Sequence, residues 1–94
     1  MEGIFVNDVG TKLVFDVGID TSQITKAEIH VRKPDKTNVT WSAQTELNST
    51  NIYYILQQND VDMVGVYKLQ PYLELSSGWK GHGTPVYMEV KEAV

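Results

Sequence analysis

Residues 62–75, Asp-Met-Val-Gly-Val-Tyr-Lys-Leu-Gln-Pro-Tyr-Leu-Glu-Leu, decide the fold that the sequence predicts. From Tyr67 onward the apolar residues recur at every second position, with Tyr67, Leu69, Leu73 and Leu75 in one phase. A period of two is that of a β-strand with one face in the core and the other in water. We therefore predict one long, half-buried strand in this segment.

The tyrosine at the start of this strand supports a more specific prediction. Immunoglobulin-like sandwiches carry a tyrosine near the start of strand F, and its hydroxyl bonds to the backbone upstream in a tyrosine corner. Tyr67 follows Gly65 in that position, and Leu69 stands where an antibody domain has its second cysteine. The alternative is that Tyr67 is only an inward-facing aromatic residue of the strand.

The two-residue period extends to most of the chain. It recurs in segments 12–18, 27–31, 39–43 and 86–90, whereas residues 52–56 are apolar on both faces. Turn-forming residues separate the segments, and only residues 59–65 have room for a single helical turn. We therefore predict one all-β domain over residues 1–94, an immunoglobulin-like antiparallel β-sandwich of about seven short strands.

Two further features belong to this structural prediction. Trp41 is the natural large core residue, but its strand comes one later than the strand that carries the antibody tryptophan. Lys33-Pro34-Asp35-Lys36 is typical of a tight turn, because proline presets φ at the first corner.

Composition excludes several classes of function. The 94 residues include 12 acidic and 8 basic side chains, which gives a formal net charge of −4, and no cysteine. The acidic excess disfavours nucleic-acid binding, since affinity for phosphates depends on Lys and Arg. Without cysteine there is no disulfide and no Cys-based zinc site. No apolar run approaches the ~20 residues of a membrane span, and Met1-Glu2-Gly3 shows no signal peptide, so we expect no membrane partner and a reducing compartment.

The titratable residues form no recognisable catalytic or metal motif. His30 has no serine, cysteine or second histidine spaced locally to pair with it, which predicts a solvent-facing side chain, and His82 sits between two glycines in a loop or hairpin tip. Asp60 and Asp62 lack the glycine and glutamate of a calcium loop, so turn capping is favoured. We expect no enzymatic activity, no cofactor and no metal. The competing hypothesis of a hydrolase requires the fold to assemble two reactive side chains in a cleft.

Aromatic residues outside the predicted core indicate a surface for a partner. Trp79 lies in a hairpin of small residues and either covers one end of the sandwich or is an exposed anchor. Tyr53 and Tyr72 lie on the outward phase of their strands, and the edge strands offer free backbone groups. The candidate partner-binding residues are Trp79, Lys80, His82, Tyr53 and Tyr72.

Three segments in order carry a resemblance to a known family. They are residues 6–11 (Val-Asn-Asp-Val-Gly-Thr), residues 29–37 (Ile-His-Val-Arg-Lys-Pro-Asp-Lys-Thr) and residues 60–81, with Val-Gly-Val-Tyr and Gly-Trp-Lys-Gly. Together they resemble small structural domains of tailed bacteriophages, similar to the N-terminal domain of the phage baseplate upper protein. The family's usual Pro-Asp-Gly turn is Pro34-Asp35-Lys36 here, which predicts another turn type or a positive φ at Lys36.

The resemblance implies a non-enzymatic virion building block that binds other virion proteins, as a homo-oligomer or in several copies. It implies synthesis in the bacterial host cytoplasm and a place in the baseplate, tail or fibre attachment region. A capsid decoration or neck protein is one alternative. A carbohydrate- or cell-surface-binding module, with Trp79 and Tyr72 stacking on sugar rings, is the other.

Overall fold

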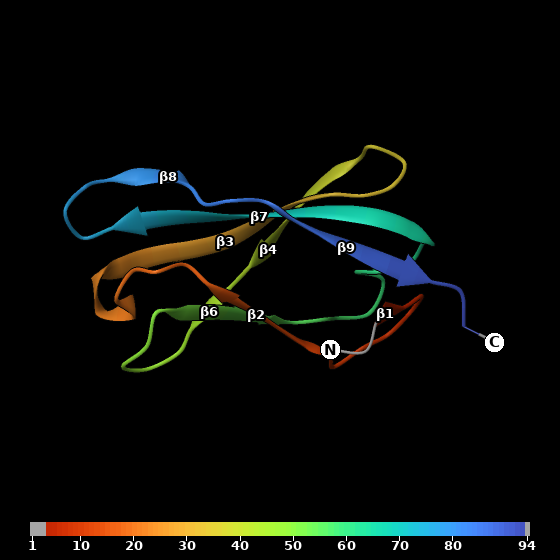
Figure 1. The fold of residues 1–94 in the computed structure, drawn as a ribbon, viewed down its shortest axis with the longest axis horizontal. Coiled ribbons are helices and arrows are strands. Elements are labelled where there is room, and N and C mark those ends of the chain that lie inside the picture. The colour runs from red at the N-terminus through yellow and green to blue at the C-terminus, as the bar shows by residue number, and fades with distance from the viewer. Residues whose placement is uncertain (1–3, 94) are drawn as a thin grey trace.

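The computed structural model describes residues 4–93, which form two β-sheets (Figure 1). The elements in chain order are β1 (Ile4–Phe5), β2 (Lys12–Asp16), the 3-10 turn η1 (Thr21–Gln23), β3 (Ile24–Arg32), β4 (Asn38–Ser42), β5 (Gln44–Thr45), β6 (Asn51–Ile55), β7 (Gly65–Leu75), β8 (Lys80–His82) and β9 (Val86–Lys91). The larger sheet has the order β1-β9-β7-β3-β4, with β8 also paired to β7, and the smaller sheet has the order β2-β6-β5. Met1, Glu2 and Gly3, in which we expect no signal peptide, lie outside the described residues.

The all-β prediction is confirmed, with two strands more than the sequence indicates in residues 4–93. The additional strands, β5 and β8, have only two and three residues. Neither shows the apolar alternation by which a strand is recognised in the sequence. Each is extended because it pairs with a longer neighbour, β6 for β5 and β7 for β8. In residues 59–65, where a helical turn was suggested, a turn extends to Val61 and a bend at residues 63–64 precedes β7. Within residues 4–93 the one 3-10 turn lies at η1.

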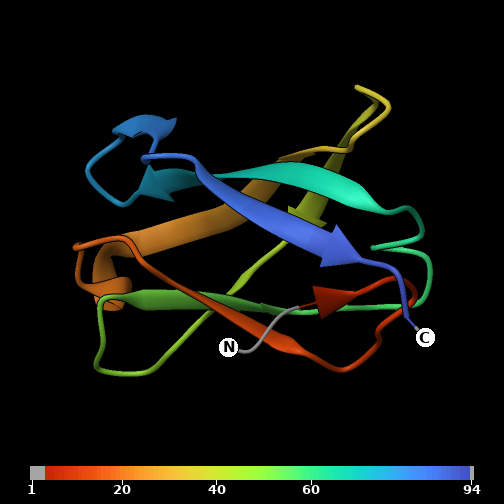
Figure 2. The same ribbon diagram turned by 45° about the vertical axis from the view of Figure 1, so that its right-hand side comes forward.

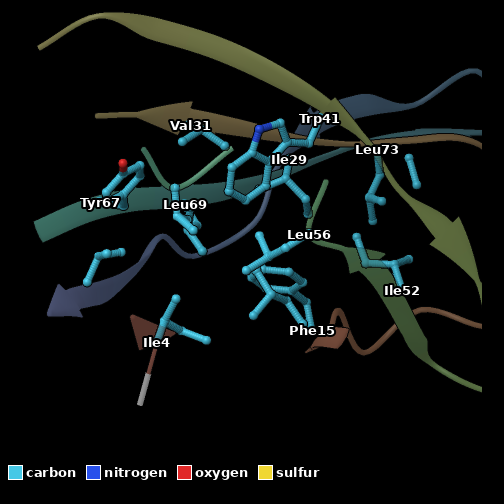
Figure 3. Close-up of a cluster of buried hydrophobic side chains, with 14 residues drawn as sticks. Ile4, Phe15, Ile29, Val31, Trp41, Ile52, Leu56, Tyr67, Leu69 and Leu73 are labelled. Carbon is cyan, nitrogen blue, oxygen red and sulfur yellow. The ribbon is translucent and has the colours of Figure 1, made fainter. Parts of the chain in front are cut away.

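The core lies between the two layers, which Figure 2 shows one above the other. Most of its buried side chains come from the predicted inward phases, whereas Val61 comes from the turn before β7 and Ile4 from β1. The full set is Ile4, Leu13, Phe15, Ala27, Ile29, Val31, Trp41, Ile52, Leu56, Val61, Tyr67, Leu69, Leu73 and Val90. In the interior Trp41 stacks on Tyr54, with ring centroids 4.7 Å apart. Side chains of the two sheets point toward one another in Figure 3, where Phe15 lies beside Leu56. The interior is therefore filled by apolar side chains from both sheets.

A proline in the middle of β7 explains why two strands share its edge. Pro71 lacks the N–H that a central strand uses in its ladder. β9 pairs with β7 only as far as Leu69, and β8 takes over from Tyr72. At the change from one to the other, the carbonyl of Pro71 accepts a hydrogen bond of 2.9 Å from Gly83 N–H. The missing donor thus falls where the chain passes from β8 to β9.

The tyrosine at the start of β7 makes the predicted backbone contacts. Tyr67 is fully buried, its hydroxyl donates to Met63 O at 3.1 Å, and the hydroxyl oxygen accepts from Met63 N–H at 3.3 Å. Burial raises the pKa of the Tyr67 phenol. The hydroxyl therefore ties the turn before β7 to the first residues of the strand.

The Pro34 turn packs against the same end of the sheet. Lys36 N–H donates to Lys33 O at 2.8 Å, which closes the turn, and Lys36 has a φ of +71°, which is one of the two alternatives predicted for this turn. Asp35 accepts hydrogen bonds from the backbone and hydroxyl of Thr37. Gly65 has a φ of +138°, and a Cβ placed on it would lie 2.7 Å from Pro34. Only glycine combines that φ with this contact.

The aspartates before β7 divide between two roles. Asp60 accepts from the N–H of Gln57 and from the hydroxyl of Tyr54, so the capping prediction is confirmed there. Burial and the hydrogen bond to Asp60 raise the pKa of Tyr54. Asp62 instead forms an ion pair of 3.0 Å with Lys33, which belongs to the Pro34 turn. Capping is therefore wrong for Asp62, because a lysine distant in sequence reaches it.

Replacing Tyr67 with phenylalanine removes its hydroxyl and leaves the ring in place. We expect the variant Tyr67→Phe to lose about 1 kcal/mol of unfolding free energy, the net value of a hydrogen bond. Urea denaturation measures this loss, with Tyr87→Phe, at an exposed tyrosine, as the matched control. An unchanged midpoint for Tyr67→Phe would show that the hydroxyl contributes nothing.

Because Gly65 contacts Pro34, adding a side chain at position 65 should cost more unfolding free energy than backbone strain alone would. We expect Gly65→Ala to cost about 3 kcal/mol, because strain adds to the overlap with the proline ring. Gly78→Ala is the control: its φ is +95° and nothing lies within 4 Å of the added methyl group, so about 1 kcal/mol is expected. Thermal unfolding measures both variants, and an equal loss of stability in Gly65→Ala and Gly78→Ala would argue against the contact with Pro34.

Candidate functional site

The register of three strands gathers polar and aromatic residues on the outer face of the larger sheet. Glu28 of β3, Tyr72 of β7 and His82 of β8 lie in one row across the sheet. His30 and Gln70 form the next row. Successive side chains alternate between faces, so all five belong to the face opposite the core. Residues far apart in sequence thereby share one surface.

Three rings of this surface are in mutual contact, and we call His30, Tyr72 and His82 the ring cluster. His30 stacks on Tyr72 with centroids 5.1 Å apart and an interplanar angle of 13°. His82 meets both rings at an angle, with centroids 5.0 Å from His30 and 5.1 Å from Tyr72. Nδ1 of His30 and Nε2 of His82 are 3.1 Å apart, a hydrogen bond in which one imidazole donates.

Two carboxylates flank the ring cluster. Oε1 of Glu28 lies 3.3 Å from Nε2 of His30, and its other oxygen lies 3.6 Å from the ammonium of Lys26. The hydroxyl of Tyr72 donates to Glu74 at 2.9 Å, and this hydrogen bond raises the pKa of the Tyr72 phenol. A continuous chain of hydrogen bonds therefore runs from Glu28 through both histidines.

His30 lies on the outer face of the larger sheet, as the prediction of a solvent-facing side chain requires, but the fold gives it partners that its local sequence does not indicate. Its side chain is 38% exposed and has Glu28, Tyr72 and His82 around it. The pairing was missed because β3 and β8 are 52 residues apart at this point and β7 separates them. The one signal in the sequence is that His30 and Tyr72 both occupy polar phases of strands.

The hydrogen-bonded chain has the parts of an acid–base site. A carboxylate that orients an imidazole can fix its tautomer. Nucleophilic catalysis also needs a hydroxyl or thiol within hydrogen-bond reach of the base. The hydrogen bonds found for the imidazoles in residues 4–93 lead to Glu28 and to each other. In the same residues no group of three or more His, Cys, Asp or Glu side chains is placed to hold a metal ion.

A cleft of about 300 Å³ adjoins the ring cluster. Its lining includes His30, Arg32, Thr40, Lys68 and Gln70. Arg32 and Lys68 lie directly opposite each other across β3 and β7, where like charges repel. Arg32 donates to Asn38 at 3.2 Å, and neither cation forms a salt bridge within the part of the chain that the structure describes. The cleft therefore presents two uncompensated positive charges.

The predicted partner-binding residues divide between two faces. Tyr72 and His82 belong to the ring cluster, and Lys80 lies in the same β8 strand. Tyr53 is remote from them: it lies on β6 of the smaller sheet, with the ammonium of Lys12 4.5 Å from its ring centroid. The face of the larger sheet thus combines most of these residues with His30 and the cleft.

Trp79 is not a lid on the core. Its side chain is 48% exposed and does not belong to the core cluster. The indole lies on the backbone of Gly81, where an added Cβ would come within 2.5 Å of the ring. The exposed alternative therefore describes Trp79 better, and a side chain at position 81 would require the indole to move.

No protein-family model matches the chain, and neither a curated protein nor a solved structure matches it. Within residues 4–93 there is no helix long and apolar enough to cross a membrane.

The hydrogen bond between Tyr72 and Glu74 predicts a pKa change that can be measured directly. A carboxylate that accepts from the neutral phenol stabilises the protonated form and raises the pKa. We therefore expect Glu74→Gln to lower the Tyr72 pKa toward the ordinary value of about 10. NMR titration of the tyrosine Cζ resonance measures it, with Glu89→Gln as the control. An unaltered Tyr72 titration in Glu74→Gln would refute the assignment.

Proposed function

We propose that this protein is a non-enzymatic binding module that docks on a partner protein through the outer face of its larger sheet. The observation that carries the proposal is the uncompensated pair Arg32 and Lys68 beside the ring cluster. A chain with net charge −4 places two cations side by side here, at a cost in repulsion. An acidic group of a partner would remove that repulsion, and the neighbouring rings would add apolar contact area.

An immunoglobulin-like arrangement is the second part of the proposal, and the strand orders support it. Variable-type immunoglobulin domains place strands C′, C, F and G in one sheet and B, E and D in the other. In their spatial order within the sheets, β4, β3, β7 and β9 take the first set of places, and β2, β6 and β5 take the second. Tyr67 then lies near the start of the strand in place F, as the tyrosine corner requires.

The identity of the partner is proposed from the resemblance to tailed-phage structural domains. The partner is another virion protein in the baseplate, tail or fibre attachment region, with a capsid decoration or neck position as the alternative, and the chain is made in the host cytoplasm. The turn supports the resemblance, since Lys36 adopts the positive φ that glycine would take in Pro-Asp-Gly.

Lys68→Gln tests the docking face, because this substitution should reduce binding to the partner without reducing the stability of the fold. The wild-type chain is expected in purified particles by mass spectrometry. We expect Lys68→Gln, supplied in trans, to be retained at least about tenfold less, which corresponds to the loss of one well-placed charge pair. Its melting temperature should stay the same or rise, since a repulsion is relieved. Lys91→Gln makes the same charge change at an exposed site on β9 and should be retained normally.

Three outcomes contradict the proposal in different ways. Absence of the wild-type chain from particles removes the virion role. Equal retention of Lys68→Gln and wild type removes the docking face. Binding on a glycan array that is lost in Trp79→Ala favours the carbohydrate-binding alternative, to which the half-exposed indole of Trp79 is suited.

A further inference from the structure

Within residues 4–93, no strand lies beside the outer backbone groups of β2 at the edge of the smaller sheet. In an antiparallel ladder, hydrogen-bonded positions alternate with positions whose N–H and C=O point away. Val17 N–H donates to Thr50 O, and Thr11 O accepts from Leu56 N–H, both at 2.9 Å. The odd-numbered residues of β2 therefore bond to β6, and the backbone groups of Lys12, Val14 and Asp16 point outward from the sheet.

An apolar groove runs along this edge between the two layers. It includes a cavity of about 160 Å³ lined by Leu13, Val14, Phe15, Leu69, Val86 and Met88. Val14 and Val86 are 51% and 44% exposed. A second hollow of about 430 Å³ continues past Asp16 toward Pro71. A strand added beside β2 would direct every second side chain into this groove.

The sequence of β2 is complementary in charge to itself. Residues 12–16 read Lys-Leu-Val-Phe-Asp, with a base at one end, an acid at the other and Val14 at the centre. When two copies run antiparallel with Val14 facing Val14, Lys12 of each lies opposite Asp16 of the other. This register pairs the three outward-pointing positions with one another, which allows about six backbone hydrogen bonds.

We propose that two copies of this chain form a symmetric dimer by antiparallel pairing of their β2 strands. Leu13 of one copy then faces Phe15 of the other on the core side, and both close the groove. Asp16 can take part without losing its present contacts, because Gly18 and Thr50 both donate to Oδ1 and leave Oδ2 for the lysine. Lys12 exchanges its 3.7 Å contact with Glu46 for the new carboxylate.

The other long or exposed edges fit a second copy less well. β4 ends the larger sheet with Asn38, Thr40 and Ser42 at its outward positions and offers no opposite charges. β9 is covered at Val90–Lys91 by β1, and Pro85 precedes it. Covered or proline-flanked edges resist pairing. β2 alone combines free backbone, an apolar groove and self-complementary charge in residues 4–93.

The dimer does not depend on the docking face proposed above. It uses the edge of the smaller sheet, whereas the ring cluster and the cleft lie on the outer face of the larger sheet. Each copy in the dimer keeps that face open, so a failed particle-retention test and a failed dimer test are separate results.

Sedimentation equilibrium up to about 1 mM protein measures the dimer, whose mass is twice 10.6 kDa. We expect Val14→Pro to be monomeric and folded, because the N–H it removes is not used within the sheet and proline is tolerated on edges. Thr40→Pro removes the equivalent outward N–H on β4 and should remain dimeric. A monomeric wild type, or a dimer broken only by Thr40→Pro, would overturn the proposal.

A charge exchange tests the register and does not rely on proline. Lys12→Glu faces Asp16 of the other copy with a like charge at two symmetric places, so the dimer should weaken about tenfold or more. The double variant Lys12→Glu/Asp16→Lys restores opposite charges and should recover most of the affinity. Equal affinity of wild type and Lys12→Glu would reject the antiparallel register, and circular dichroism verifies that each variant is folded.

Discussion

Burial of the inward face of β7 is the interaction on which the rest of the structure depends. The chain has no cysteine, so no covalent link joins its two sheets. Tyr67, Leu69 and Leu73 are buried in the core, and such side chains each contribute roughly 1.5–3 kcal/mol when removed from water. β7 also pairs with β3, β8 and β9. Its position therefore sets where the outward residues of its neighbours come together.

The features that depend on local chain geometry could be predicted from the sequence. Alternation of apolar residues identified the inward phases of β2, β3, β4 and β7, because a strand exposes its two faces to different surroundings. The Tyr67 bond spans four residues, and the positive φ of Lys36 belongs to one turn. In each case the cause and its effect lie within a few residues.

The candidate site could be predicted only in part, because it depends on register between distant strands. Tyr72 was predicted to point outward and His82 to lie in a loop or hairpin tip, both as candidate partner-binding residues. Nothing in their spacing indicates that His30 lies between them and Glu28. That contact requires β3 and β8 to flank β7 with a particular offset, which Pro71 and the change from β8 to β9 help to set. The repulsive pair Arg32 and Lys68 likewise arises only when β3 and β7 are aligned.

The unequal size of the two sheets explains why a small domain carries two separate surfaces. The smaller sheet has three strands and ends at β2, so one side of the core is left as a groove between layers. The larger sheet is wide enough to present a full outer face, on which polar side chains can gather without disturbing the interior. A chain of 94 residues buries only about 60–70% of its unfolded surface, and completing the open edge with another strand adds burial without lengthening the chain. Closing the edge and binding through the face are therefore compatible, because they use opposite layers of the sandwich.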